Sequence, residues 1–167
     1  MEDLITDYIT GQKVPNVGAE ANRQAVERFF VAEKGFKKQD IQVNVPIQMQ
    51  IRDQSYRSHV DLVVVLDGRR LMAVKCAPGS LGSREREIVS AARLLDAYQI
   101  PLALVSDGKS AILLDAPSGR KIGEGMAAIP SRRELSNQYK EVVLGPLAGD
   151  RRERCLLYTS DAADERG

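Results

Sequence analysis

Residues 60 to 75 read Val-Asp-Leu-Val-Val-Val-Leu-Asp-Gly-Arg-Arg-Leu-Met-Ala-Val-Lys, and this stretch decides the fold. Two apolar runs flank a turn in which Gly68 tolerates the positive φ that a tight turn needs, so the stretch predicts a β-hairpin. The apolar residues are contiguous rather than alternating, which is typical of strands covered on both faces. We therefore expect these two strands to be neighbours at the centre of a sheet.

A carboxylate and an ammonium stand at the ends of this hairpin. Asp61 opens the first strand and Lys75 closes the second. Both groups are costly to bury among apolar strands, so we expect them at the rim of the sheet, facing water or each other. This rim is the first candidate site.

The remaining strands are shorter or less buried. Residues 41 to 51 alternate between apolar and polar side chains, which predicts a half-buried strand, and Pro46 indicates an edge position or a bulge. Three short strands are expected at residues 101 to 105, 111 to 114 and 120 to 122. The first two are joined by a hairpin turn.

Three helices are expected around these strands. Residues 20 to 34 have apolar residues at three- and four-residue spacing and end at Gly35, a C-cap. Residues 84 to 98 form a second helix with Ser83 as N-cap, and a capping box at Ser131 starts a third, to about Val143. In the first helix, the polar residues Glu20, Arg23, Gln24 and Glu27 are interpreted as a solvated face. Residues 1 to 18 predict a single helical turn and a loop.

Composition excludes several classes of protein. Lys and Arg total 24 against 23 acids, so the net charge of +1 gives no global attraction for nucleic acid. Two cysteines, a lone His59 and no Cys-x-x-Cys pattern support neither a disulfide scaffold nor a zinc site. The apolar runs are far shorter than the roughly 20 residues that span a bilayer, and the N-terminus lacks a signal-peptide pattern. We expect a cytoplasmic protein with no membrane association.

The order of strands and helices predicts an α/β (α+β) fold with a central mixed sheet flanked by helices. This pattern resembles the restriction-endonuclease-like core of the PD-(D/E)XK nucleases, and within it the N-terminal domain of type I restriction enzyme R subunits. The resemblance rests on four stretches: Glu20-Ala-Asn-Arg-Gln, Val60-Asp-Leu-Val-Val, Met72-Ala-Val-Lys-Cys-Ala-Pro and Pro101-Leu-Ala-Leu-Val-Ser-Asp-Gly. It implies a nuclease-like domain over residues 15–125, after an N-terminal extension (1–14) and before a C-terminal helix and linker (126–149). Residues 150–167 resemble translated sequencing-adapter read-through, and we expect an unstructured, non-native tail there on a truncated chain.

The resemblance implies a catalytic set with one departure. Family members carry an acid two residues before the lysine, where this chain has Ala73. Such nucleases need at least two carboxylates around Mg²⁺. The implied metal ligands are Asp61 and Glu87, or Glu85 in its place, since either glutamate can face the sheet from the second helix.

Lys75 is the implied catalytic lysine and Glu20 a supporting acid. Five arginines near the proposed edge favour a phosphate-facing surface: Arg69, Arg70, Arg84, Arg86 and Arg93. Three hypotheses stay open: a Mg²⁺-dependent DNA endonuclease domain, an inactive nuclease-fold module that binds nucleic acid or a restriction-modification subunit, and a structural domain in which Asp61 and Lys75 form an ordinary salt bridge.

Overall fold

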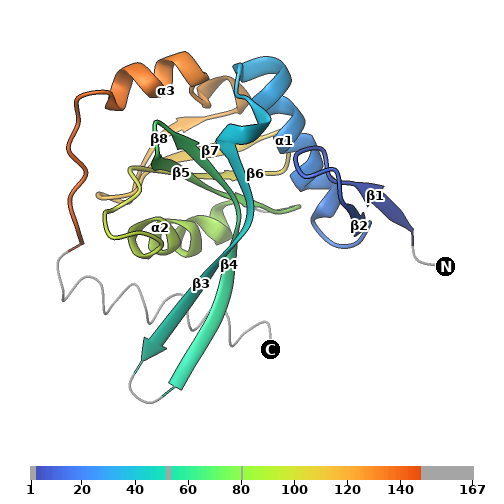
Figure 1. Ribbon diagram of the computed structural model, residues 1–167, viewed down its shortest axis with the longest axis horizontal. Helices are drawn as coiled ribbons and strands as arrows, with labels where there is room; N and C mark the ends of the chain where they lie inside the picture. Colours follow the sequence, from blue (N-terminus) through green and yellow to red (C-terminus); the bar gives the residue numbers. More distant parts are fainter. Residues whose placement is uncertain (1–2, 52–53, 80, 148–167) are drawn as a thin grey trace.

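The computed structural model describes residues 3–51, 54–79 and 81–147 of the chain. They form a six-stranded mixed sheet flanked by helices and a small N-terminal hairpin (Figure 1). The strands lie side by side in chain order, and each neighbouring pair is antiparallel except β5 and β6, which are parallel. The predicted fold class is confirmed, and the arrangement is compatible with a restriction-endonuclease-like core.

The elements have the following bounds. The sheet contains β3 (Ile41–Ile51), β4 (Gln54–Leu66), β5 (Arg69–Cys76), β6 (Leu102–Ser106), β7 (Ala111–Asp115) and β8 (Arg120–Glu124). The helices are α1 (Glu20–Lys34), α2 (Glu85–Leu94) and α3 (Arg132–Tyr139), with 3-10 turns at Lys38–Asp40, Gly82–Arg84 and Met126–Ala128.

The central hairpin of the sheet is β4 and β5, as the opening stretch predicts. The two strands pair with Leu62 opposite Val74. Their turn places Asp67 at φ 53° and Gly68 at φ 75°. Two successive positive φ values are what a two-residue hairpin turn of type I′ requires, so this Gly68 matches the twist of the strands it joins.

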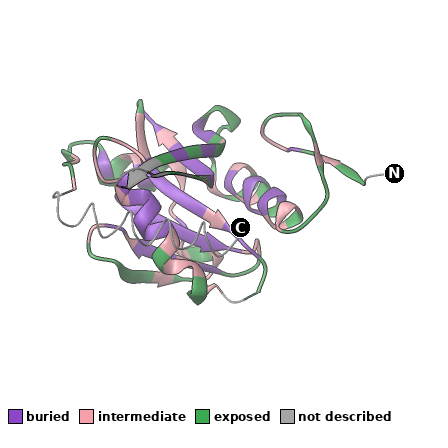
Figure 2. Cartoon of the chain, turned by 90° about the horizontal axis from the view of Figure 1, so that it is seen from below, coloured by how far each residue is buried: buried purple, intermediate pink, exposed green. Residues whose placement is uncertain are grey.

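Each face of the sheet has its own apolar core. Met72 and Val74 of β5 pack in one cluster with Phe30 of α1 and Leu135 of α3, whereas Ala73 packs in the other cluster with residues of α2. Successive side chains of a strand point to opposite faces, so one strand serves both cores. Figure 2 shows the resulting buried strands between partly exposed helices.

The hairpin of β3 and β4 extends beyond the rest of the sheet. Residues 62–66 of β4 pair with β5, while residues 54–60 pair with β3 alone. Figure 1 shows these two strands projecting away from the body, and we call residues 45–51 and 54–60 the arm. β3 is an edge strand, so the edge position predicted from Pro46 is confirmed.

The N-terminal segment differs from the prediction of a helical turn and a loop. One helical turn is present, closed by a hydrogen bond from Gly11 N to Asp7 O. On either side of it the chain forms an antiparallel hairpin of β1 (Leu4–Thr6) and β2 (Lys13–Pro15). The ladder pairs Ile5 with Val14, and local periodicity does not reveal such a pairing between separate segments.

Three predicted helix boundaries are wrong, two in α2 and one in α3. α2 follows a 3-10 turn, so Arg84 rather than Ser83 occupies its N-cap position, and it ends at Leu94 instead of residue 98. α3 has the predicted Ser131 capping box but ends at Tyr139. The guanidinium of Arg69 donates hydrogen bonds to the carbonyls of Tyr139 and Val142. These carbonyls are satisfied from outside the helix, so the chain can leave the helical path there.

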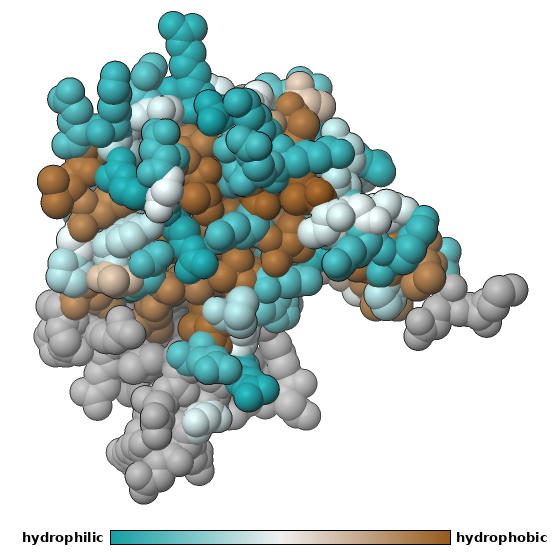
Figure 3. All heavy atoms as spheres, viewed as in Figure 1, coloured by the Kyte–Doolittle hydropathy of each residue, from teal (hydrophilic) through white to brown (hydrophobic). Residues whose placement is uncertain are grey.

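On the face seen in Figure 3, hydrophilic side chains are interspersed with apolar ones. Within the described part of the chain, none of the helices is long and apolar enough to cross a membrane. The tail at residues 150–167 lies outside the described residues, and the domain boundaries stay predictions.

Candidate functional site

Asp61, Lys75 and Glu87 meet at the end of β5. The Lys75 ammonium lies 3.9 Å from Asp61 Oδ2 and 3.6 Å from Glu87 Oε1. Each side chain is partly accessible, with 12 to 14% of its surface exposed. Asp61 and Lys75 face α2 because they alternate with Val63 and Ala73, which pack against that helix. The sheet and α2 therefore bring two carboxylates to one cation.

The Asp61 carboxylate is held on both oxygens. Its Oδ2 accepts a hydrogen bond of 2.8 Å from the backbone N–H of Cys76, and its Oδ1 lies 3.3 Å from His59 Nε2. Burial alone would raise the pKa of Asp61, but the hydrogen bond from His59, the Lys75 ammonium and the Cys76 N–H together hold it below its usual value. Asp61 is thus kept ionised and pointed toward Lys75.

Glu87, and not Glu85, faces Lys75. Besides Lys75, Glu87 contacts Arg84, whose guanidinium lies 3.8 Å from Glu87 Oε2. The Glu85 carboxylate lies beside Gly82 in the preceding turn and interacts electrostatically with Lys121 of β8 rather than with Lys75. Both glutamates lie in the first turn of α2, and the two-residue difference turns them by about 200° around the helix. Of the two glutamates that the sequence left open, Glu87 is therefore the one that lies close to Lys75.

The interpretation of α1 as having a solvated polar face is wrong for three of its four residues. Arg23, Gln24 and Glu27 are 4%, 5% and 0% exposed. Arg23 pairs with Glu20, lies 3.4 Å from Asp7 of the N-terminal hairpin and is 3.9 Å from Glu27. We call Asp7, Glu20, Arg23 and Glu27 the buried charge cluster.

The buried charge cluster holds more acids than its single arginine can neutralise. Neither Glu27 oxygen has a hydrogen-bond donor among the described residues. Burial, together with the neighbouring Asp7 carboxylate, raises the pKa of Glu27 to about 8. Burial also raises the pKa of Glu20, which senses the charges of Asp7 and Asp61. Glu20 therefore lies within electrostatic reach of Asp61 but is paired with Arg23, not with Lys75.

This cluster predicts a pH-dependent stability. The pKa of Glu27 is about 8 in the folded chain against 4.5 for an ordinary Glu, so the folded state keeps a proton that the unfolded chain releases. The free energy of unfolding should therefore fall as pH rises from about 5 to about 8. We expect the Tm to drop by roughly 5–10 °C across this range, and Glu27→Gln to remove most of the drop.

The measurement is thermal unfolding followed by circular dichroism at pH 5, 6, 7 and 8. Burial raises the pKa of Cys76 well above 9, so its titration lies outside this range. Glu33→Gln, an exposed position on the same helix, is the matched control. Parallel pH profiles for the wild type and Glu27→Gln would show that Glu27 is ionised in the folded protein at all these pH values.

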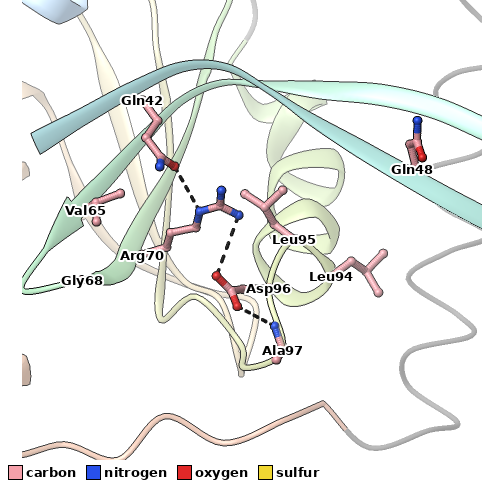
Figure 4. A pocket seen from close by; sticks show the side chains of 9 residues that line it. All are labelled: Gln42, Gln48, Val65, Gly68, Arg70, Leu94, Leu95, Asp96 and Ala97. Atoms are coloured by element: carbon pink, nitrogen blue, oxygen red, sulfur yellow. Dashed lines mark hydrogen bonds and ion pairs between the residues drawn. The ribbon is translucent and has the colours of Figure 1, made fainter. Parts of the chain in front are cut away.

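Three of the five predicted arginines do not lie at this edge. Arg69 and Arg70 stand at the opposite end of β5 from Lys75, about 17–20 Å away along the strand. Arg70 lines a pocket of about 750 Å³, where its side chain contacts Gln42 and Asp96 (Figure 4). Arg93 donates to the carbonyl of Ala116. The prediction overlooked the length of β5, and Arg84 is the arginine whose ion pair joins it to the site.

The site offers hard oxygen donors rather than a closed metal cage. The described residues contain no group of three or more His, Cys, Asp or Glu side chains placed to hold a metal ion. Asp61 and Glu87 supply carboxylate oxygens on either side of Lys75. Mg²⁺ commonly binds through one or two carboxylates together with water and substrate phosphate, so this donor set fits Mg²⁺.

Sequence reasoning missed His59 and most of the buried charge cluster. His59 precedes Asp61 by two residues, and the period of a strand places both on one face. Arg23 and Glu27 lie next to Val26 and Phe30 at helical spacing, so the periodicity already placed them beside the buried stripe. Asp7 had no such signal, because its position depends on a hairpin that was not predicted.

Comparisons with known proteins give one family. The sequence model of the family described as "Type I restriction enzyme R protein N terminus" matches residues 18–130. No curated protein matches the chain. A solved structure, protein VC1899 from Vibrio cholerae, is similar at 14% identity and a TM-score of 0.35, over 89% of this chain and 34% of its own. The chain thus spans about a third of the length of that protein.

Proposed function

The chain belongs to the family of type I restriction enzyme R protein N termini, and from this premise we propose that it is a nuclease domain that hydrolyses DNA phosphodiester bonds with Mg²⁺. The observation that carries the proposal is the placement of Lys75 within 4 Å of two carboxylates from different elements. Glu87 of α2 supplies the acid that Ala73 lacks. We further propose that the domain acts in the cytoplasm as part of a restriction-modification complex.

Each residue has a distinct role in the proposed reaction. Asp61 and Glu87 would hold Mg²⁺, which when bound supplies positive charge at the scissile phosphate and a more acidic water. Lys75 donates hydrogen bonds to a phosphate oxygen and stabilises the negative charge that develops there. The Cys76 N–H and His59 fix the Asp61 carboxylate, so it need not reorganise when substrate arrives. Glu20 is further away, paired with Arg23, and supports the charge balance of the site.

A second candidate function follows from Ala73. Its methyl group is fully buried under α2 and offers no ligand. If Glu87 does not replace the missing acid, the same surface is an inactive nuclease fold that binds nucleic acid or another restriction-modification subunit. The two candidates differ in whether Glu87 matters for hydrolysis.

A matched pair of substitutions tests the proposal. Glu87→Gln should slow Mg²⁺-dependent nicking of supercoiled plasmid by on the order of 10²-fold, because it replaces a carboxylate ligand of the metal with an uncharged amide. Glu85→Gln, two residues earlier on the same helix, should leave the rate unchanged. The measurement is conversion of supercoiled to nicked plasmid over time, with EDTA as the blank.

Calorimetric titration with Mg²⁺ and Mn²⁺ accompanies the kinetics. Wild-type protein should bind Mn²⁺ more tightly than Glu87→Gln does. No nicking and no metal binding by the wild type would contradict the nuclease proposal and leave the inactive module. Equal nicking rates for Glu87→Gln and Glu85→Gln would contradict a role of Glu87 in the site.

A further inference from the structure

The arm leaves the sheet at the candidate site. Asp61 follows residues 54–60 of β4, which pair with β3 alone, and precedes residues 62–66, which pair with β5. The arm therefore begins where Asp61 meets Lys75 and projects from there as a two-stranded antiparallel ribbon (Figure 1). Whatever binds along the arm is continuous with the site.

The two faces of the arm differ in character. Val45, Ile47 and Val60 are buried in the core under α2. The opposite face exposes Pro46 and Gln48 of β3 and Ser55, Arg57 and His59 of β4. Pairing places Gln48 opposite Arg57 and Pro46 opposite His59, so these side chains share one surface.

This surface is rich in hydrogen-bond donors and contains no acid among the arm side chains that the structure describes. Arg57 is exposed and forms no ion pair with a described residue. Arg57 and His59 alternate along β4, and His59 Nε2 lies 3.3 Å from Asp61 Oδ1, so His59 links the exposed face of the arm to Asp61. The distance along the strand from Asp61 to Arg57 is about 13 Å, which equals the rise of about four base pairs along the DNA axis.

We propose that the exposed face of the arm binds double-stranded DNA, with Arg57 on a backbone phosphate and Gln48 beside it. This proposal rests on the proposed function, because the arm would hold the duplex whose scissile phosphate reaches Lys75. A two-stranded ribbon fits the width of a major groove. With 24 basic and 23 acidic residues the chain has no global attraction for DNA, so a local contact of this kind has to provide it.

A protein partner fits this face less well than DNA does. The core of a protein interface is depleted of charge and enriched in large apolar or aromatic anchors. The exposed arm residues offer a guanidinium, an imidazole, an amide and a hydroxyl instead. Docking of a protein subunit is therefore the competing outcome of the test.

The test measures binding without cleavage. The full chain is titrated into a fluorescently labelled 30-base-pair duplex in EDTA, and anisotropy gives the Kd between 50 and 200 mM salt. Arg57→Ala should weaken binding about three- to tenfold at 100 mM salt, and lower the slope of log K against log salt by about 1. Arg120→Ala, at the exposed start of β8 on the opposite edge of the sheet, is the matched control and should bind as the wild type does.

Crosslinking locates the contact independently. In a Cys155→Ser background, a photoreactive maleimide on Ser55→Cys should crosslink the duplex, and the same reagent on Ser118→Cys should not. Wild-type affinity of Arg57→Ala, or equal losses in Arg57→Ala and Arg120→Ala, would overturn the proposal. Because the assay contains no divalent metal, a failure of plasmid cleavage leaves this result unaffected, and loss of binding in Arg57→Ala with wild-type metal affinity separates the arm from the metal site.

Discussion

Asp61→Asn should abolish Mg²⁺-dependent plasmid nicking, by at least about 10³-fold, while the protein stays folded. The amide keeps the shape of the carboxylate but carries no charge, so it loses its attraction for the metal and for Lys75. Its oxygen can still accept the hydrogen bond from Cys76 N–H, which is why we expect a native circular dichroism spectrum. Lys75→Met should slow nicking by roughly 10²–10³-fold through loss of the phosphate-stabilising cation.

The two variants separate binding of metal from stabilisation of charge. Asp61→Asn should lose Mn²⁺ binding in calorimetry. Lys75→Met should keep it or bind more tightly, because the ammonium that now lies between Asp61 and Glu87 is gone. Arg133→Met, an exposed basic residue on α3, controls for the change of charge. Nicking by Asp61→Asn at the wild-type rate would show that Asp61 does not hold the metal.

Ala73→Glu combined with Glu87→Gln should restore nicking that Glu87→Gln alone has lost. Position 73 is two residues before Lys75 on the same face of β5, so a longer side chain there can extend along the strand toward the ammonium. The double variant moves the acid from α2 back to the strand. We expect a recovery of at least about tenfold over Glu87→Gln, measured on supercoiled plasmid.

This exchange has a cost in stability. Ala73 is fully buried beside α2, and a glutamate adds volume and a polar group there. We expect a loss of about 1–3 kcal/mol in the free energy of unfolding, measured by urea titration of both variants. Ala73→Gln/Glu87→Gln is the control, with the same volume and no charge. Equal activity of the two double variants would mean that the acid acts only through packing.

The sequence predicts the sheet better than it predicts the environment of the site. Contiguous apolar runs identified β4 and β5 because burial on both faces leaves a direct mark on composition. Helix ends were less predictable, since the Tyr139 carbonyl at the end of α3 accepts a hydrogen bond from Arg69 of a distant strand. The position of Glu87 against Lys75 depends on the rotation of α2, which a 3-10 turn sets and a capping pattern does not reveal. Glu27 was predicted to face solvent because its side chain is charged, although its helical spacing from Phe30 places it beside the buried face of α1.

The single parallel pair has a consequence for how the chain reaches its final form. Among the described strands, β3, β4 and β5 form one antiparallel meander and β6, β7 and β8 another. Backbone pairing joins the two meanders at the β5–β6 seam, and α2 in the crossover packs against both β5 and β6. Local hairpins form quickly, whereas a pairing across a long connection must first overcome its loop-closure entropy. We therefore expect the two-carboxylate arrangement to assemble late in folding, when the β5–β6 pairing forms.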